Sequence, residues 1–97
     1  MIADAGEHVT QTLPLRPRDR AMYLAALAVG FATAGVRDDE AIPTLVSACD
    51  GRHGDAVAAR RRLYSSRLGS VPDRREAARL LDIVCTRTRP SRLPRPA

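Results

Sequence analysis

The chain has 97 residues, a formal net charge of +5 and an apolar fraction of 44%, which suffices for one globular domain of ordinary composition. Without its proline-bearing ends, roughly 70 residues would remain, close to the lower limit for a fold held by one core. The aromatic supply is Tyr23, Phe31 and Tyr64, with no Trp. We therefore expect a core of Leu, Val, Ile and Ala.

All sixteen basic residues are arginine, and neither Lys nor Asn occurs in the chain. Together with abundant alanine, this usage is typical of a high-GC bacterial genome, so arginine enrichment by itself is weak evidence for a function. The charge is compatible with nucleic acid, an anionic membrane or an acidic protein as partner. Part of the excess lies near the chain ends, because residues 17–88 hold twelve Arg against nine Asp and Glu and so carry +3 of the net +5.

Residues 1–16 show no sustained periodicity, and Pro14 and Pro17 oppose helix before position 17, so we expect a flexible N-terminal arm. We expect a single helical domain over 17–89 and a disordered, basic, proline-rich tail over 90–97.

The first predicted helix spans about 18–34, with Pro17 suited to its first turn and Gly35 to its end. It is apolar on every side, which predicts a central, buried helix. Larger side chains occupy one side, and two rows of small residues occupy the others (Ala25, Ala28, Ala32; Ala26, Gly30, Ala34). Small rows allow close packing by a neighbouring helix, and a self-association face is the alternative.

The apolar stretch 21–36 has some features of a membrane or targeting segment. Its sixteen residues fall short of the ~20 that a membrane-spanning helix needs. Arg16, Arg18 and Arg20 before it, and the Ala-Thr-Ala sequence at 32–34, resemble a secretory signal. The long leader with acidic residues argues against that, so we expect a cytoplasmic protein and keep secretion as an alternative.

The second predicted helix spans about 39–50, with Asp38 or Asp39 as its cap. Its apolar stripe has the spacing of one helix face (Ile42, Leu45, Val46, Cys49). Pro43 is compatible with this helix only close to the first turn.

The third predicted helix spans about 55–68, and two arginines interrupt its apolar sector. Arg60 and Arg67, one heptad apart, fall between Leu63 and Tyr64 on a helical wheel. Our hypothesis is that these four residues form a partly exposed binding site for a protein partner, since interfaces favour Tyr and Arg. In the alternative, the arginine stems cover the core edge and their charges pair with Glu76 or Asp82.

The fourth predicted helix spans about 73–88 and ends before Pro90. Ser70 or Asp73 is its candidate cap, and Asp73 and Glu76 have the spacing of a capping box. Four helices with short connections predict an all-α, compact four-helix bundle. Two stacked helical hairpins are the alternative architecture.

No metal, cofactor or catalytic site is predicted. Cys49 and His53 have a CxxxH spacing and Cys85 could join them, but a fourth ligand is missing. His8 and His53 are the available imidazole bases, and no partner for catalysis is evident beside them. We expect both cysteines to be buried and reduced, although the sequence leaves open whether they are bonded to each other.

Two function hypotheses follow. The first is a small, non-enzymatic protein-interaction module, an adaptor or regulatory subunit, whose partner is another protein or a second copy of the chain. The alternative is a basic helical nucleic-acid-binding protein that uses Arg61, Arg62, Arg74 and Arg75, since guanidinium groups suit phosphate. The helix from 55 lacks the Asn and Gln side chains that usually accompany Arg in reading bases, which favours the first hypothesis.

Overall fold

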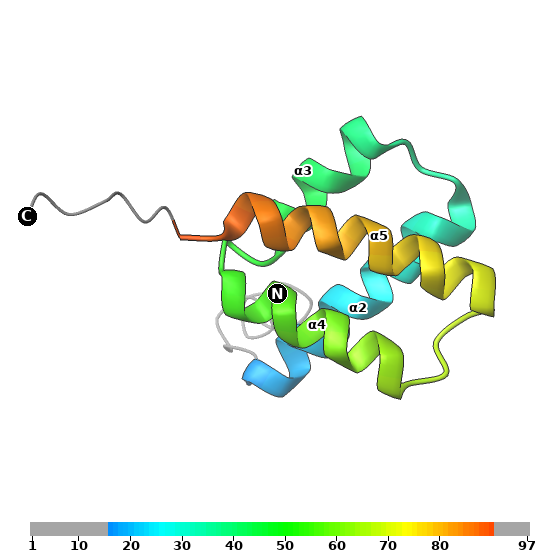
Figure 1. The fold of residues 1–97 in the computed structure, drawn as a ribbon, viewed down its shortest axis with the longest axis horizontal. Helices are drawn as coiled ribbons and strands as arrows, with labels where there is room; N and C mark the ends of the chain where they lie inside the picture. Colours follow the sequence, from blue (N-terminus) through cyan, green and yellow to red (C-terminus); the bar gives the residue numbers. More distant parts are fainter. Residues whose placement is uncertain (1–15, 91–97) are drawn as a thin grey trace, which may run out of the picture.

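The computed structural model describes residues 16–90, and within that range it contains four α-helices and no strand. They are α2 (Pro17–Ala34), α3 (Asp38–Ala48), α4 (His53–Ser65) and α5 (Val71–Thr88) (Figure 1). The predicted all-α fold class is confirmed. The N-terminal arm and C-terminal tail that the sequence predicts lie outside the described residues, apart from Arg16 and Pro90.

The helices form a bundle in which α2 and α5 each contact all three other helices. Helices α4 and α5 run side by side in opposite directions in front of α2, and α3 lies on the side of α5 away from α4 (Figure 1). All four helices contribute to one hydrophobic cluster. A shared core of this kind is that of a compact bundle, whereas two stacked hairpins would each contact the other through one face.

The core is aliphatic, as the composition predicts. Its largest fully buried side chains come from every helix (Leu24, Ile42, Leu45, Leu63, Leu80, Leu81, Val84). Each contributes about 1.5–3 kcal/mol through removal of apolar surface from water. Both tyrosines are exposed and Phe31 is half-buried, so aromatic rings contribute little to this interior.

Helix α2 is central, but it is not buried on every side. Ala25 and Ala28 have no exposed surface, whereas Ala26, Gly30 and Ala34 are exposed. A Cβ atom added at Gly30 would have no neighbour within 4 Å. The expectation that neighbouring helices pack on both small rows is therefore wrong for the second row, because the three other helices all lie on one side of α2.

Helix α3 begins at Asp38 and ends at Ala48, two residues before the predicted end. No side chain caps its start, so the expectation of an Asp38 or Asp39 cap is wrong. Both carboxylates lie in the first turn, where negative charge still favours the helix dipole. The end comes early because Asp50 (φ 52°) and Gly51 (φ 68°) adopt left-handed conformations, and the Gly51 N–H donates to the Val46 carbonyl at 3.0 Å.

Helix α4 begins at His53 and ends at Ser65, so it lies two to three residues before the predicted range at both ends. The Ser65 and Ser66 hydroxyls donate to the Arg62 and Leu63 carbonyls at 3.2 and 3.3 Å. Such local bonds compete with helix continuation. The backbone becomes extended at Ser66, and Arg67 therefore lies outside the helix.

Helix α5 begins at Val71, and Ser70 is its cap. The Ser70 hydroxyl accepts a hydrogen bond from the Asp73 N–H at 3.2 Å. The alternative cap at Asp73, with its capping box to Glu76, is wrong because Asp73 is the third residue of the helix. The Asp73 carboxylate instead accepts from the Thr33 hydroxyl at 2.8 Å, which joins α5 to α2.

One ion pair is largely withdrawn from solvent, and it joins the start of α2 to α4. The Arg20 Nε donates to Asp55 Oδ2 at 2.9 Å, and its Nη2 lies 3.4 Å from Oδ1. The Asp55 side chain is 10% exposed and that of Arg20 is 30% exposed. Removal of Arg20 would leave a buried carboxylate without this counter-charge, which is the costly case.

Replacement of Gly69 by alanine should destabilise the fold. Gly69 has φ +66°, and an added Cβ would lie 2.7 Å from Val29 Cγ1. We expect a loss of about 1–3 kcal/mol in the free energy of unfolding, from left-handed strain and overpacking. The matched control is Gly30→Ala at an exposed helical position, which should stabilise by up to about 1 kcal/mol. Urea denaturation measures both, and equal effects would contradict the assigned turn.

Arg20→Ala should destabilise by about 2–3 kcal/mol, and more than Asp55→Ala does, because the remaining arginine can reach water and the remaining carboxylate cannot. Denaturation of both single variants and the double variant gives their coupling energy. Arg37→Ala is the control, since its pair with Asp39 is solvent-exposed on both sides and should contribute less than about 0.5 kcal/mol. Zero coupling between Arg20 and Asp55 would contradict this assignment.

Candidate functional site

A hollow of about 480 Å³ lies between the last turns of α4 and the first turns of α5. We call it the α4–α5 groove. Its apolar lining consists of Leu63, Tyr64, Val71 and Ala78, and its charged lining of Arg74, Arg75, Arg79 and Asp82.

The apolar part of the groove combines buried and exposed side chains. Leu63 and Ala78 are buried, whereas Tyr64 is 66% exposed and Val71 is 52% exposed. Among the described residues, three large hydrophobic side chains are exposed, and the third is Tyr23 on α2. Two of the three therefore border the same hollow. Grouped exposed apolar surface of this kind marks contact sites more often than scattered single residues do.

Arg60 holds one side of the groove in place. Its guanidinium forms an ion pair with Asp82 on α5, and its central carbon lies 5.5 Å from the centroid of the Tyr64 ring. A cation at this distance is attracted to the ring. Asp82 is one of the two pairing partners that the sequence suggested for Arg60, so Arg60 contacts both Asp82 of α5 and Tyr64 of α4.

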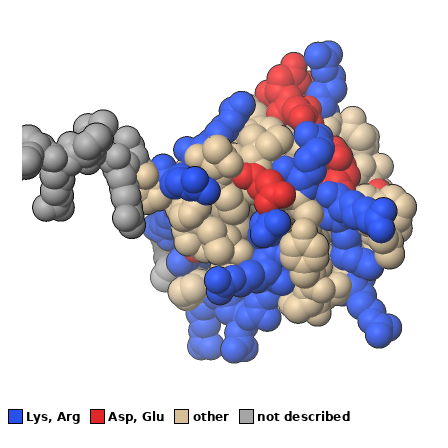
Figure 2. Space-filling model, viewed as in Figure 1, with Lys and Arg blue, Asp and Glu red and all other residues tan. Residues whose placement is uncertain are grey.

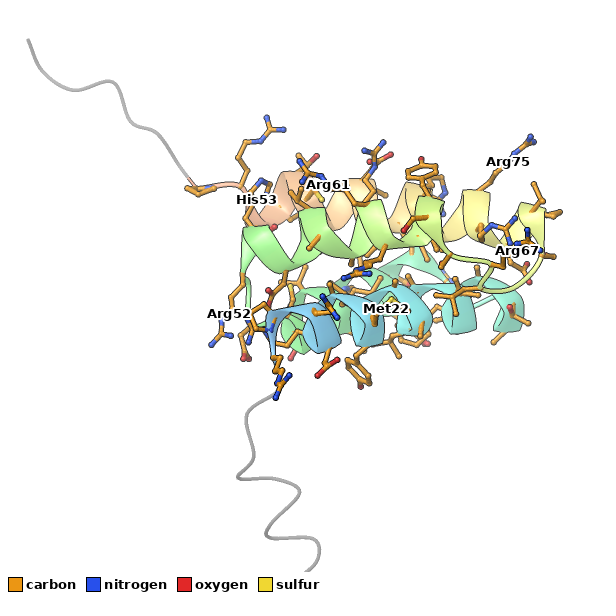
Figure 3. All side chains as sticks on the ribbon, turned by 90° about the horizontal axis from the view of Figure 1, so that it is seen from below. Met22, Arg52, His53, Arg61, Arg67 and Arg75 are labelled. Atoms are coloured by element: carbon orange, nitrogen blue, oxygen red, sulfur yellow. The ribbon has the colours of Figure 1, made fainter. Side chains whose placement is uncertain are left out.

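The four residues of the predicted protein-binding site are only partly brought together. Leu63 and Tyr64 line the groove, and Arg60 contacts Tyr64 from beside it. Arg67 is exposed in the connection between α4 and α5 and does not line the groove. Figure 3 shows it beyond the end of α4. Arg60 and Arg67 would share one helix face only if α4 continued through Arg67, and α4 ends at Ser65.

Three arginines along the groove have different surroundings. Arg74 donates to the Leu68 and Gly69 carbonyls at 3.3 and 2.7 Å and so holds the α4–α5 connection. Arg79 donates to both Asp38 and Glu76, at 2.6–2.9 Å. Arg75 is exposed and points outward (Figure 3), and it has no ion pair with any of the described residues.

Sequence reasoning missed Val71, Ala78 and Arg79 as lining residues. Their contribution depends on which face of α5 lies against α4, and the apolar stripe of α5 is broad enough to leave that choice open. The one available signal was the position of Val71. An apolar residue before the predicted start of the helix indicates that the apolar surface of α5 extends further toward its N-terminus.

Arg79 also determines the electrostatics beside the groove. Its hydrogen bonds to Asp38 and Glu76, and secondarily its positive charge, hold the pKa of each carboxyl below its ordinary range. Both acids therefore remain ionised in the folded protein at a pH where an unpaired carboxyl begins to take up a proton.

Positive charge is concentrated in the second half of the described chain. Residues 52–90 hold ten Arg against four Asp and Glu, whereas residues 16–51 hold four Arg against five. The arginines of the nucleic-acid hypothesis all belong to the basic half (Arg61, Arg62, Arg74, Arg75). Figure 2 shows Arg side chains spread across the face that α4 and α5 form, with acidic residues between them.

The structure does not bring Cys49, Cys85 and His53 together as a metal site. Both cysteines are free, and Cys49 is buried while Cys85 is half-buried. Burial raises the pKa of the Cys85 thiol, which keeps it protonated and weakly nucleophilic. Within residues 16–90, no three metal-binding side chains lie close enough together to hold an ion.

Comparisons with family models, curated proteins and solved structures found no match to this chain. The functional argument therefore rests on the surface of the bundle itself. In the part of the chain that the structure describes, no helix has the length and apolar character needed to cross a membrane.

Arg79→Gln should destabilise the protein at neutral pH and have less effect in acid. Because the folded-state pKa values of Asp38 and Glu76 are lowered, their contribution is complete above the ordinary carboxyl pKa of about 4 and is lost as the pH falls through the lowered values. Urea denaturation should show that the variant and the unsubstituted chain differ less in free energy of unfolding at pH 3 than at pH 7. Arg75→Gln is the control and should show no such change; a constant difference for Arg79→Gln would contradict the assigned cause.

Proposed function

We propose that this protein is a non-enzymatic protein-interaction module, an adaptor or regulatory subunit, whose α4–α5 groove receives an apolar side chain of its partner. The observation that carries the proposal is the position of exposed Tyr64 and Val71 above buried Leu63 and Ala78. The partner is another protein or a second copy of the chain.

The composition of the groove suits this role. A tyrosine that is 66% exposed can bury additional apolar area on binding, worth about 25 cal/mol per Å² before the costs of association. Arg60 lies beside the tyrosine, and Arg75 lines the groove. Tyr and Arg are among the residues that most often dominate the binding energy of protein interfaces. The ion pair of Arg60 with Asp82 keeps the tyrosine oriented, which reduces the entropy lost on binding.

The proposal of a non-enzymatic role is supported by the chemistry of the described residues. His53 is the one imidazole among them, and its Nδ1 lies 3.3 Å from the Thr88 hydroxyl, which donates its own hydrogen to the Val84 carbonyl. The free cysteines suit a reducing compartment, so we propose the cytoplasm as the site of action.

Nucleic-acid binding is the second candidate, and the surplus of six arginines over carboxylates in residues 52–90, ten against four, favours it. Phosphate contacts by Arg61, Arg62, Arg74 and Arg75 would make affinity fall steeply with salt. Apolar burial in the groove would depend on salt much less.

The experiment is affinity capture of the full chain from its native host, with and without nuclease treatment. Val71→Ser and Tyr64→Ser should each reduce recovery of the captured protein at least about fivefold, which corresponds to about 1 kcal/mol. Tyr23→Ser, which removes the exposed tyrosine outside the groove, is the matched control and should leave recovery unchanged. Sedimentation of the purified chain identifies a second copy as partner.

Two outcomes would refute the proposal. One is loss of all captured material on nuclease treatment, which would favour nucleic acid. The other is equal loss with the Tyr23 and Tyr64 variants, which would show that the groove has no special part in binding.

A further inference from the structure

A second hollow, of about 450 Å³, lies at the opposite end of the contact between α4 and α5. Its walls include His53 and Arg61 from α4 and Arg89 at the end of α5, and half-buried Val57 and Cys85 supply apolar lining. Asp82 borders both this hollow and the α4–α5 groove. We call this second space the cationic hollow.

The positive charge of the cationic hollow is not neutralised within the described residues. Its one carboxylate, Asp82, is paired with Arg60. Arg61 and Arg89 are exposed, and neither has an ion pair or side-chain hydrogen bond to any residue of the described range. Two guanidinium groups with all their donors available therefore border one small space.

The hydrogen bonds of His53 determine which of its ring nitrogens is available to a ligand. The Thr88 hydroxyl donates its single hydrogen to the Val84 carbonyl at 2.8 Å. The same oxygen must then accept the bond at 3.3 Å from His53 Nδ1, which places the imidazole hydrogen on Nδ1. His53 Nε2 keeps its lone pair, and no bond to it occurs within residues 16–90.

We propose that the cationic hollow binds the terminal phosphate of a phosphate monoester, such as a phosphorylated side chain or a small phosphorylated metabolite. The planar forks of Arg61 and Arg89 match phosphate oxygens in bidentate contacts. His53 Nε2 can accept the hydrogen of a monoprotonated phosphate. Binding here is separate from the proposed protein contact in the α4–α5 groove.

A monoester suits the site better than the backbone of a nucleic acid does. A phosphodiester carries one negative charge per phosphate and gains affinity from many contacts along a strand. Figure 3 shows His53 at the start of α4, whereas Arg67 and Arg75 lie at the opposite end of the bundle. The cationic hollow is thus a local site for a single phosphate group.

The test is a titration of the full chain with inorganic phosphate, followed by NMR of the arginine Nε–H and histidine ring resonances. Chloride at matched ionic strength is the reference for simple screening. We expect saturable shifts confined to His53, Arg61 and Arg89. Arg61→Gln and Arg89→Gln should each weaken binding about tenfold or more. Arg75→Gln, at an exposed and unpaired arginine outside the hollow, should leave binding unchanged.

Two further probes test whether a phosphorylated side chain binds as the free phosphate ion does. Blocked phosphoserine should bind as phosphate does, and blocked serine should not bind. Shifts that spread over all exposed arginines without saturation would overturn the proposal. So would tighter binding of a short oligothymidylate that Arg75→Gln weakens as much as Arg61→Gln, since this would identify a nucleic-acid surface.

Discussion

Close approach of α2 to its neighbours is the constraint on which the rest of this small domain depends. With no tryptophan in the chain and both tyrosines exposed, the helices can exclude water only by packing closely. The alanines at their contacts have no exposed surface (Ala25 and Ala28 of α2, Ala56 and Ala59 of α4, Ala77 of α5). Larger residues at these positions would separate the helices and leave voids, at a cost of 1–3 kcal/mol or more for each misfit.

The same constraint shapes the surface. The core is filled by Leu, Ile, Val and Ala, and the Tyr64 ring lies on the surface of α4. There it contacts Arg60, which is paired with Asp82 of α5. Two hollows follow this contact, one largely apolar and one cationic. Both proposals concern this one side of the bundle. They differ in chemistry because exposed Tyr64 and Val71 border the first hollow, whereas the unpaired Arg61 and Arg89 border the second.

Local backbone chemistry explains where the sequence-based helix boundaries were displaced. Gly35, Pro17 and Ser70 act at the helix ends for the reasons their residue types suggest. Asp50 adopts a left-handed conformation that a pattern of apolar residues does not reveal. Ser65 and Ser66 end α4 through hydroxyl bonds that compete with the next helical turn. Because α4 ends at Ser65, Arg67 lies in the connection to α5 and not on the predicted binding surface.

The sequence by itself determined the number of helices, their approximate extents and the aliphatic character of the core, because one apolar face per turn must be removed from water. Only the tertiary structure decided which surfaces remain open. One row of small residues on α2 remains exposed (Ala26, Gly30, Ala34). Val71 and Arg79 of α5 line the same groove as Leu63 and Tyr64 of α4. The physical reason is that a helix's apolar face is set by its own periodicity, whereas a groove requires the relative rotation and position of two helices that are distant in sequence.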